Sequence, residues 1–171
     1  MSALDELTSA IAGAAARAVP AVVRIGRDGG RGAGVVFRPG LVLTCSHNLR
    51  GQAVTVTFGD GRVATGEVRG VDSEGDLAVV AVDTADIAPI SWPPLGGGGP
   101  VLGQAVFAVS LLPAGGARVT VGHVSATGAA FRGPRGRLIT DGVEHTAVVG
   151  RGSSGGPVVD RDGNLIGINT H

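Results

Sequence analysis

The chain has 171 residues, which is enough for one large domain or for two small lobes that share a core. Its 14 basic and 14 acidic residues give a formal net charge of zero, and no run of like charges favours nucleic acid or an anionic membrane as a partner. With 31 glycines, 9 prolines and only 16% charged residues, the composition favours short strands joined by tight turns.

The N-terminal segment predicts neither a secretory signal nor a membrane anchor. Asp5 and Glu6 stand where a signal peptide would be basic, and Gly13 and Arg17 interrupt the apolar stretch well short of the roughly 20 residues of a membrane span. The single cysteine, Cys45, excludes an internal disulfide and is consistent with a reducing compartment. We therefore expect a cytoplasmic location, or one outside the cytoplasm if the sequence is a domain excised from a longer chain.

The chain begins with a helical pattern and continues with strands. Leu4, Leu7, Ile11 and Ala15 recur at helical spacing and predict a short amphipathic helix within residues 1–18, with Ser2 as its cap. From residue 19 the pattern changes to short β-branched runs separated by glycine and proline, which predicts a first β-barrel lobe over residues 19–88. Its expected strands cover residues 22–25, 33–37, 41–45, 52–58, 63–68 and 77–82.

Residues 89–100 are rich in proline and contain the glycine run 96–99, so they predict a linker between two lobes. Strands resume after the linker and predict a second lobe over residues 101–171. They are expected at residues 104–109, 118–124, 137–140, 144–149, 158–159 and 164–169. The predicted fold is all-β, with two antiparallel β-barrel lobes of about six strands each.

The segment from Gly150 to Pro157 is a glycine- and serine-rich turn that precedes a short strand. Glycines on both sides of Ser154 permit a turn with positive φ, which exposes the serine hydroxyl and leaves nearby N–H groups free to stabilise negative charge. By itself, in so glycine-rich a chain, the segment slightly favours a surface loop over a nucleophile turn. The presence of a base and of an orienting carboxylate elsewhere in the chain would favour the nucleophile over the surface loop.

His47 and Asp76 are the candidates for these two groups. His47 follows the predicted strand 41–45, and Asp76 directly precedes the strand 77–82, so that it could accept a hydrogen bond from Nδ1–H of His47. Taken singly, a histidine at a strand end is often structural, and an aspartate there is often a cap. The order His–Asp–Ser, with each residue at a strand–loop junction, favours a catalytic triad assembled between two lobes. Asp72 and Asp83 are weaker candidates because neither directly precedes a strand.

The motifs around these residues resemble those of trypsin-like serine proteases of the HtrA/Deg type, which have the chymotrypsin fold. Residues 44–47 (TCSH) match the family's T-x-A-H with serine in place of alanine, and residues 76–79 match D-L-A-V. Residues 152–157 (GSSGGP) match G-N-S-G-G-P with serine in place of asparagine. The similarity extends to residues 19–25, 122–126 and 166–170, so it covers about residues 18–171.

The resemblance implies a serine endopeptidase that acts on unfolded or damaged proteins, as in protein quality control, without metal or organic cofactor. It implies Ser154 as nucleophile, His47 as general acid and base, and Asp76 as the residue that orients His47. The backbone N–H groups of Gly152 and Ser154 would form the oxyanion hole. Val148 would lie at the base of the specificity pocket, which suggests small aliphatic side chains at the cleavage position.

Two departures from the family pattern carry further expectations. Ser153 stands where secreted digestive proteases have an aspartate that pairs with a new N-terminus, so activation by zymogen cleavage is not expected. The sequence ends at His171, whereas the family continues with a strand and a helix and usually a PDZ domain. We expect an incomplete specificity pocket and an unpaired strand edge. Residues 1–20 contain no aromatic residue of the kind that supports HtrA trimers, which leaves monomer and trimer open.

Other functions are less well supported by the sequence. A protease-fold binding or chaperone-like module, active only after assembly, is the main alternative to an enzyme. An esterase of unrelated fold is disfavoured because its nucleophile turn would lead into a helix, whereas residues 155–157 lead into a strand. The glycine run lacks the lysine of a phosphate-binding loop. The histidines have no spacing typical of a metal site; they are His47, His123, His145 and His171.

Overall fold

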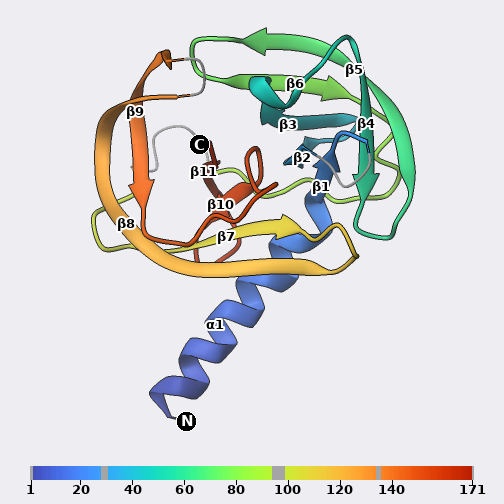
Figure 1. Cartoon of the computed structure of the whole chain (residues 1–171). Coiled ribbons are helices and arrows are strands. Elements are labelled where there is room, and N and C mark those ends of the chain that lie inside the picture. Colours follow the sequence, from blue (N-terminus) through green and yellow to red (C-terminus); the bar gives the residue numbers. More distant parts are fainter. Residues whose placement is uncertain (1, 28–30, 94–98, 134–135, 171) are drawn as a thin grey trace.

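The computed structural model describes residues 2–27, 31–93, 99–133 and 136–170. It has two β lobes, with an N-terminal helix extending from the body (Figure 1). The predicted linker falls partly outside the described residues, because 94–98 are not among them. At its start, Ile90 N–H donates to the Val36 carbonyl of the first lobe, and Leu165 N–H of the second lobe donates to the Ser91 carbonyl. The segment therefore bridges the two lobes.

Helix α1 spans Ala3–Ala18 and begins with a capping box. The Ser2 hydroxyl accepts from Asp5 N–H at 3.2 Å, and the Asp5 carboxylate accepts from Ser2 N–H at 2.8 Å. The predicted helix and cap are confirmed, but the packing differs from the expected amphipathic face. Ala14 and Ala18 are buried, whereas the N-terminal leucines stay exposed because that half of the helix projects from the body (Figure 1). In the described part of the chain, no helix has the length and apolarity needed to cross a membrane.

The first lobe is a closed six-stranded barrel, as the sequence predicted. The strands pair antiparallel in the spatial order β1-β2-β3-β6-β5-β4. Alternating valines fill the interior, and the β-branched runs that predicted the strands supply this core. The strands are β1 Val22–Ile25, β2 Gly32–Arg38, β3 Leu41–Cys45, β4 Ala53–Phe58, β5 Val63–Asp72 and β6 Leu77–Ala81.

The second lobe is a strongly curved five-stranded sheet in the order β11-β10-β7-β8-β9 (Figure 1). The sequence predicted six strands here, because it divided residues 137–149 into two. The structure has one strand there. The turn-like Asp141-Gly142 pair does not end the strand but lies at a register shift in its pairing with β8, and Asp141 has φ +57°. The strands are β7 Ala105–Leu111, β8 Ala117–Arg132, β9 Leu138–His145, β10 Pro157–Val159 and β11 Leu165–Ile168.

One hydrophobic core joins the helix and both lobes. Phe58 of the barrel and Phe107 of β7 are almost completely buried in the same cluster, together with Ala14 and Ala18 of α1. Burial of one such aromatic side chain stabilises the fold by roughly 1.5–3 kcal/mol. The shared core holds β1 of the first lobe beside β7 of the second. It thereby fixes how the two lobes are docked.

Candidate active site

The structure brings together the three residues that the sequence singled out. His47 Nδ1 lies 2.7 Å from Asp76 Oδ2, and His47 Nε2 lies 2.8 Å from Ser154 Oγ. His47 and Asp76 belong to the first lobe, whereas Ser154 precedes β10 of the second. The result is a continuous hydrogen-bonded chain from carboxylate to imidazole to hydroxyl across the lobe boundary.

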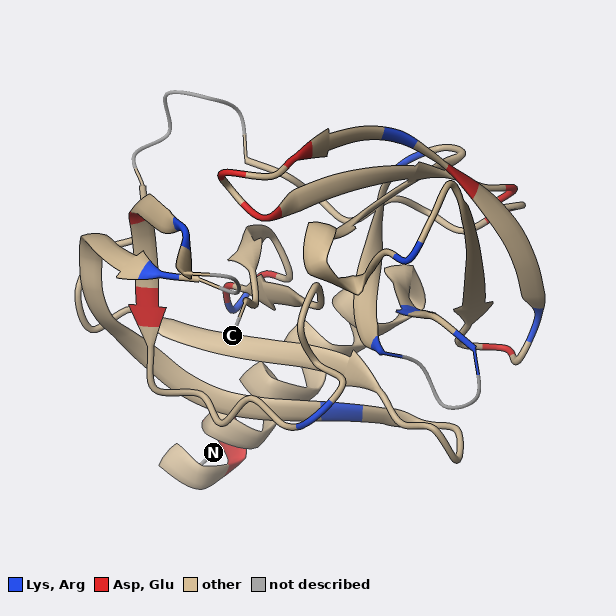
Figure 2. Ribbon diagram, turned by 45° about the horizontal axis from the view of Figure 1, so that its top comes forward, with Lys and Arg blue, Asp and Glu red and all other residues tan. Residues whose placement is uncertain are grey.

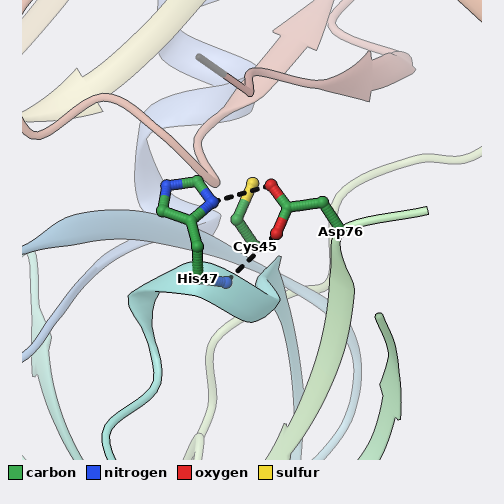
Figure 3. A group of neighbouring side chains, drawn as sticks. All are labelled: Cys45, His47 and Asp76. Atoms are coloured by element: carbon green, nitrogen blue, oxygen red, sulfur yellow. Dashed lines mark hydrogen bonds and ion pairs between the residues drawn. The ribbon is translucent and has the colours of Figure 1, made fainter. Parts of the chain in front are cut away.

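The register of β3 and β6 places His47 beside Asp76. The last residue of β3, Cys45, pairs with the first residue of β6, Leu77, so the residue after one strand lies next to the residue before the other. A 3₁₀ turn over Ser46–Asn48 then directs the imidazole toward the carboxylate (Figure 3). Asp76 has φ +56°, in the left-handed region that aspartate adopts more readily than most residues.

Asp76 accepts hydrogen bonds at both carboxylate oxygens. Oδ1 accepts from Ser46 Oγ at 2.8 Å and from His47 N–H at 3.1 Å, and Oδ2 accepts from Thr170 Oγ1 at 2.7 Å in addition to the imidazole. Burial of the side chain opposes ionisation, but the hydrogen bonds from Thr170, His47 and Ser46 outweigh it and lower the pKa of Asp76 below its usual 3.8. The carboxylate is therefore charged at neutral pH.

This charge determines the tautomer of His47. A carboxylate can only accept, so Nδ1 carries the proton and Nε2 of the neutral ring is left as an acceptor for the Ser154 hydroxyl. Sequence reasoning found Asp76 and His47 but missed the two supporting hydroxyls. Ser46 occupies the position at which the family motif has alanine, which was the available signal, whereas Thr170 lies 94 positions from Asp76 in the chain and gave none.

Ser154 is positioned by two successive β-turns. Ser153 N–H donates to the Gly150 carbonyl at 3.1 Å, and Gly156 N–H donates to the Ser153 carbonyl at 2.9 Å. The third residue of each turn is a glycine in the left-handed region, Gly152 at φ +83° and Gly155 at φ +89°, as type II turns require. The glycines that predicted a turn with positive φ are thus located at the two positions that need them.

Two N–H groups of this turn are available to an external oxygen. Within residues 2–27, 31–93, 99–133 and 136–170, neither Gly152 N–H nor Ser154 N–H donates to a protein acceptor. Gly152 also lines the same cavity as His47. These are the two donors that the sequence predicted for an oxyanion hole.

The first lobe holds the carbonyl of Ser154. This oxygen accepts from Ala33 N–H of β2 at 2.8 Å and from the buried amide of Asn48 at 2.9 Å. The next residue lies so close to β2 and β3 that a Cβ on Gly155 would overlap the Ala33 carbonyl and the Thr44 hydroxyl. The backbone of the nucleophile is therefore fixed by the lobe that carries the base. Sequence reasoning missed Asn48, although it directly follows His47.

Replacement of Asn48 by alanine is expected to affect both stability and activity. It removes a buried donor to the Ser154 carbonyl, which typically costs about 1–3 kcal/mol of unfolding free energy. Displacement of the nucleophile by a fraction of an ångström lowers turnover on the order of 10–100-fold. Urea denaturation and peptide hydrolysis measure the two effects, with the exposed Gln52→Ala as control. Wild-type turnover in Asn48→Ala would show that this hydrogen bond does not position Ser154.

Residues after β11 hold the opposite side of the nucleophile turn. The Asn169 carbonyl accepts from Gly155 N–H at 2.7 Å, and Asn169 N–H donates to the Gly156 carbonyl at 2.9 Å. The side-chain amide of Asn169 also contacts His145, whose Nε2 lies 3.0 Å from Oδ1. His145 therefore contacts Asn169, which holds the turn, and is not a hydrogen-bond partner of Ser154.

Cys45 lies beside His47 and Asp76 (Figure 3). Its Sγ and ligand atoms of His47 and Asp76 fall within 4.8 Å of one another, close enough to hold a metal ion. Burial, reinforced by the charge of Asp76, raises the pKa of the Cys45 thiol to about 12, and Sγ–H donates to the Asn169 carbonyl at 3.2 Å. A metal would need the thiolate and would have to replace the His47–Asp76 bond, so the donor set fits a triad better than a metal centre. His171, among the histidines considered for a metal, lies outside the described residues.

The remaining predicted positions lie around the turn. Ser153 is buried, and its hydroxyl donates to Ser110 Oγ at 3.1 Å instead of to a charged group. Val148 is 73% exposed, and its carbonyl accepts from Thr120 Oγ1. The structure does not place Val148 in the cavity beside His47, and its contribution to a specificity pocket stays a prediction.

Comparison with known proteins agrees with this geometry. The family model described as "Trypsin-like peptidase domain" matches residues 32–168, which include all three residues of the chain from carboxylate to hydroxyl. The serine protease PepD of Mycobacterium tuberculosis is 33% identical over 177 residues, covering 91% of this chain and 38% of the relative. The serine endoprotease DegS of Escherichia coli is 32% identical over 183 residues, covering 97% of this chain and 50% of DegS. The chain thus spans half or less of the length of these relatives.

Solved structures give the same result. The HtrA-type protease AlgW, solved with a tripeptide, matches with a TM-score of 0.80 and 32% identity, covering 93% of this chain and 53% of AlgW. The serine endoprotease of Yersinia pestis matches with a TM-score of 0.74 and 32% identity, covering 94% and 57%. Deg5, at 24% identity and a TM-score of 0.80, agrees in fold. The chain therefore belongs to the family of trypsin-like peptidase domains, with HtrA-type serine proteases among its relatives.

Proposed function

We propose that the protein is a serine endopeptidase that hydrolyses polypeptides through an acyl-enzyme, with Ser154 as nucleophile. The observation that carries this proposal is the uninterrupted chain of hydrogen bonds from Asp76 through His47 to Ser154, with both links shorter than 3 Å. The geometry supports the roles that the reaction needs: the Asp76 carboxylate can only accept from Nδ1, and a neutral imidazole held in this way presents its lone pair at Nε2 to the Ser154 hydroxyl.

In the first half of the reaction, Ser154 Oγ attacks the substrate carbonyl while its proton moves to His47 Nε2. The carbonyl oxygen becomes an oxyanion, and the N–H groups of Gly152 and Ser154 donate hydrogen bonds to it. Asp76 stabilises the imidazolium that forms and does not itself become protonated. The intermediate collapses when the C–N bond breaks and Nε2 gives its proton to the leaving amine.

In the second half, a water molecule takes the place of the amine. His47 Nε2 accepts a proton from this water, whose oxygen attacks the acyl carbon of the ester with Ser154. Breakage of the ester bond returns the proton to Ser154 Oγ and releases the carboxylic acid. Proton and electron pairs balance over the cycle without a cofactor.

We propose unfolded or damaged proteins as substrates, as the resemblance to HtrA-type proteases implies. The relatives support the coarser class of polypeptides, because several are named as serine endoproteases. An apolar contact from Val148 would favour small aliphatic side chains at the cleavage position.

A fluorophosphonate probe tests the proposal directly, because it reacts only with an activated serine. We expect stoichiometric labelling at Ser154, located by mass spectrometry of the tryptic peptide. Labelling should disappear in His47→Ala, which removes the base, and should persist in Ser125→Ala, an exposed serine on β8.

Two results would count against an enzyme. An unlabelled wild-type protein, or a label at another residue, would overturn the assignment of Ser154. A second outcome is that the wild-type protein is not labelled but binds an unfolded polypeptide, and that Ser154→Ala binds it with the same affinity. In that case a protease-fold binding module is the better description.

A further inference from the structure

Arginines from both lobes surround the cavity beside His47. This cavity has a volume of about 710 Å³ and is lined by His47 and Gly152, so it adjoins the proposed site of reaction. The first lobe contributes Arg24, Arg31 and Arg50, and the second contributes Arg118 and Arg151. Basic segments of both lobes are coloured blue in Figure 2.

The charge of this cavity is not compensated within the described part of the chain. Its lining contains no Asp or Glu, and across residues 2–27, 31–93, 99–133 and 136–170 the single salt bridge is that between His47 and Asp76. Arg24 donates only to the Pro113 carbonyl, at 3.5 Å. A chain of zero net charge therefore gathers five of its 14 basic residues around one cavity. Like charges at a concave surface concentrate positive potential and attract anions.

The position of the cavity indicates which part of a substrate would enter it. Its first-lobe side continues from His47 to Asn48 and Arg50, and its second-lobe side includes Gly152, which precedes the nucleophile. Val148, which the family resemblance assigns to the pocket for the acyl side of the substrate, is not part of its lining. Because His47 protonates the leaving amine in the proposed reaction, a cavity lined by His47 and by Asn48 and Arg50 directly after it adjoins the leaving-group side of the scissile bond.

We infer that the protein prefers substrates with aspartate or glutamate just after the scissile bond, on the leaving-group side. The inference rests on the proposed endopeptidase function and adds a substrate class to it. A guanidinium binds a carboxylate through two parallel hydrogen bonds, which lysine cannot reproduce, and every basic residue of this chain is an arginine. A cavity of this size accommodates two or three acidic side chains, which would then share the five guanidinium groups.

Three internally quenched peptides test this preference. They share one sequence and differ only at the two residues after the scissile bond, which are Glu-Glu, Gln-Gln or Lys-Lys. We expect kcat/KM for the Glu-Glu peptide to exceed that for Gln-Gln about tenfold at low salt, with Lys-Lys the poorest. At about 0.5 M salt the preference should fall severalfold, because ions screen exposed charges.

The double variant Arg31→Gln/Arg50→Gln removes two first-lobe guanidinium groups of the cavity lining that do not belong to the nucleophile turn, residues 150–157. It should reduce the kcat/KM ratio of the Glu-Glu to the Gln-Gln peptide from about tenfold to about twofold or less. Each exposed guanidinium–carboxylate pair is worth only about a few-fold, so the loss of two pairs removes most of the preference. Arg69→Gln, an exposed arginine of β5 outside the cavity, should keep the wild-type ratio. A wild-type ratio near one, or a ratio unchanged in the double variant, would overturn the inference.

A binding measurement separates failure of this inference from failure of the proposed function. The Glu-Glu and Gln-Gln peptides, each labelled with a fluorophore, are titrated with Ser154→Ala in the wild-type arginine background and in the double variant, and anisotropy is recorded. If no peptide is cleaved by wild type but Glu-Glu binds tighter than Gln-Gln and loses this advantage in the double variant, the endopeptidase function fails and the acidic-peptide site stands. Equal binding of the peptides would reject the site irrespective of turnover.

Discussion

Ser154→Ala is expected to lower kcat for peptide hydrolysis on the order of 10⁶-fold. Among the residues that the structure describes, the Ser154 hydroxyl is the one hydrogen-bond partner of His47 Nε2, at 2.8 Å, and alanine has no atom that could accept the acyl group. Steady-state hydrolysis of an internally quenched peptide measures the loss. The fold should survive, since the substitution removes one hydrogen bond worth about 1 kcal/mol.

Ser153→Ala is the matched comparison for this experiment. Ser153 is also buried and also lies in the nucleophile turn, but its hydroxyl donates to Ser110 and not to the imidazole. We expect Ser153→Ala to alter kcat by less than about tenfold, consistent with the loss of one neutral hydrogen bond. Equal losses in the two variants would mean that the turn tolerates neither change, and retained turnover in Ser154→Ala would reject it as nucleophile.

Asp76→Asn is expected to lower kcat about 10⁴-fold near neutral pH. Asparagine has the shape of aspartate, but its NH₂ group can face Nδ1 and favour the tautomer that protonates Nε2. The Ser154 hydroxyl then has no base. The new amide also meets donors from Ser46, Thr170 and the His47 backbone, which a carboxylate accepts and an NH₂ group does not. Asp72→Asn, at an exposed acid that ends β5, should leave kcat near wild type.

The stability of the same variant should depend on pH in a defined direction. Because the folded state lowers the pKa of Asp76 below 3.8, the carboxylate contributes stability above that value and loses it as pH falls through the lower, folded pKa. The advantage of wild type over Asp76→Asn in unfolding free energy should therefore be constant above about pH 5 and shrink toward pH 2. Urea denaturation at several pH values measures it. A difference independent of pH would show that the carboxylate is not stabilised in its charged form.

Local sequence patterns predicted the parts of the structure that depend on local interactions. Alternating β-branched residues predicted the barrel strands, and the glycines around Ser154 predicted a turn with positive φ at Gly152 and Gly155. The order of His47, Asp76 and Ser154 predicted their convergence, because strand ends at a lobe boundary meet in one cleft. The strand and turn patterns each involve a few residues that are neighbours in the chain. The triad residues are far apart in the chain, but each was found through its own short local motif.

Features that depend on distant segments could not be predicted in this way. Thr170 reaches Asp76 only because the chain after β11 crosses the lobe boundary, and Asn48 reaches Ser154 only because the lobes are docked. The charges of the arginine cavity come from separate segments, so the sequence displays no basic run although the structure has a basic surface. The bulge in β9 was missed because Asp141-Gly142 has the composition of a turn.

The clamp on the Ser154 carbonyl gives the first lobe control over the second. Ala33 N–H and the Asn48 amide hold the nucleophile's own peptide unit against the lobe that carries His47, so a motion that parts the lobes must break these two hydrogen bonds before it withdraws Ser154 from His47. Such an opening would be sub-global, because the strands of each sheet pair within their own lobe. Ligands that bind both lobes at once would oppose this opening, and the reactivity of Ser154 would report what fraction of the molecules has the lobes docked.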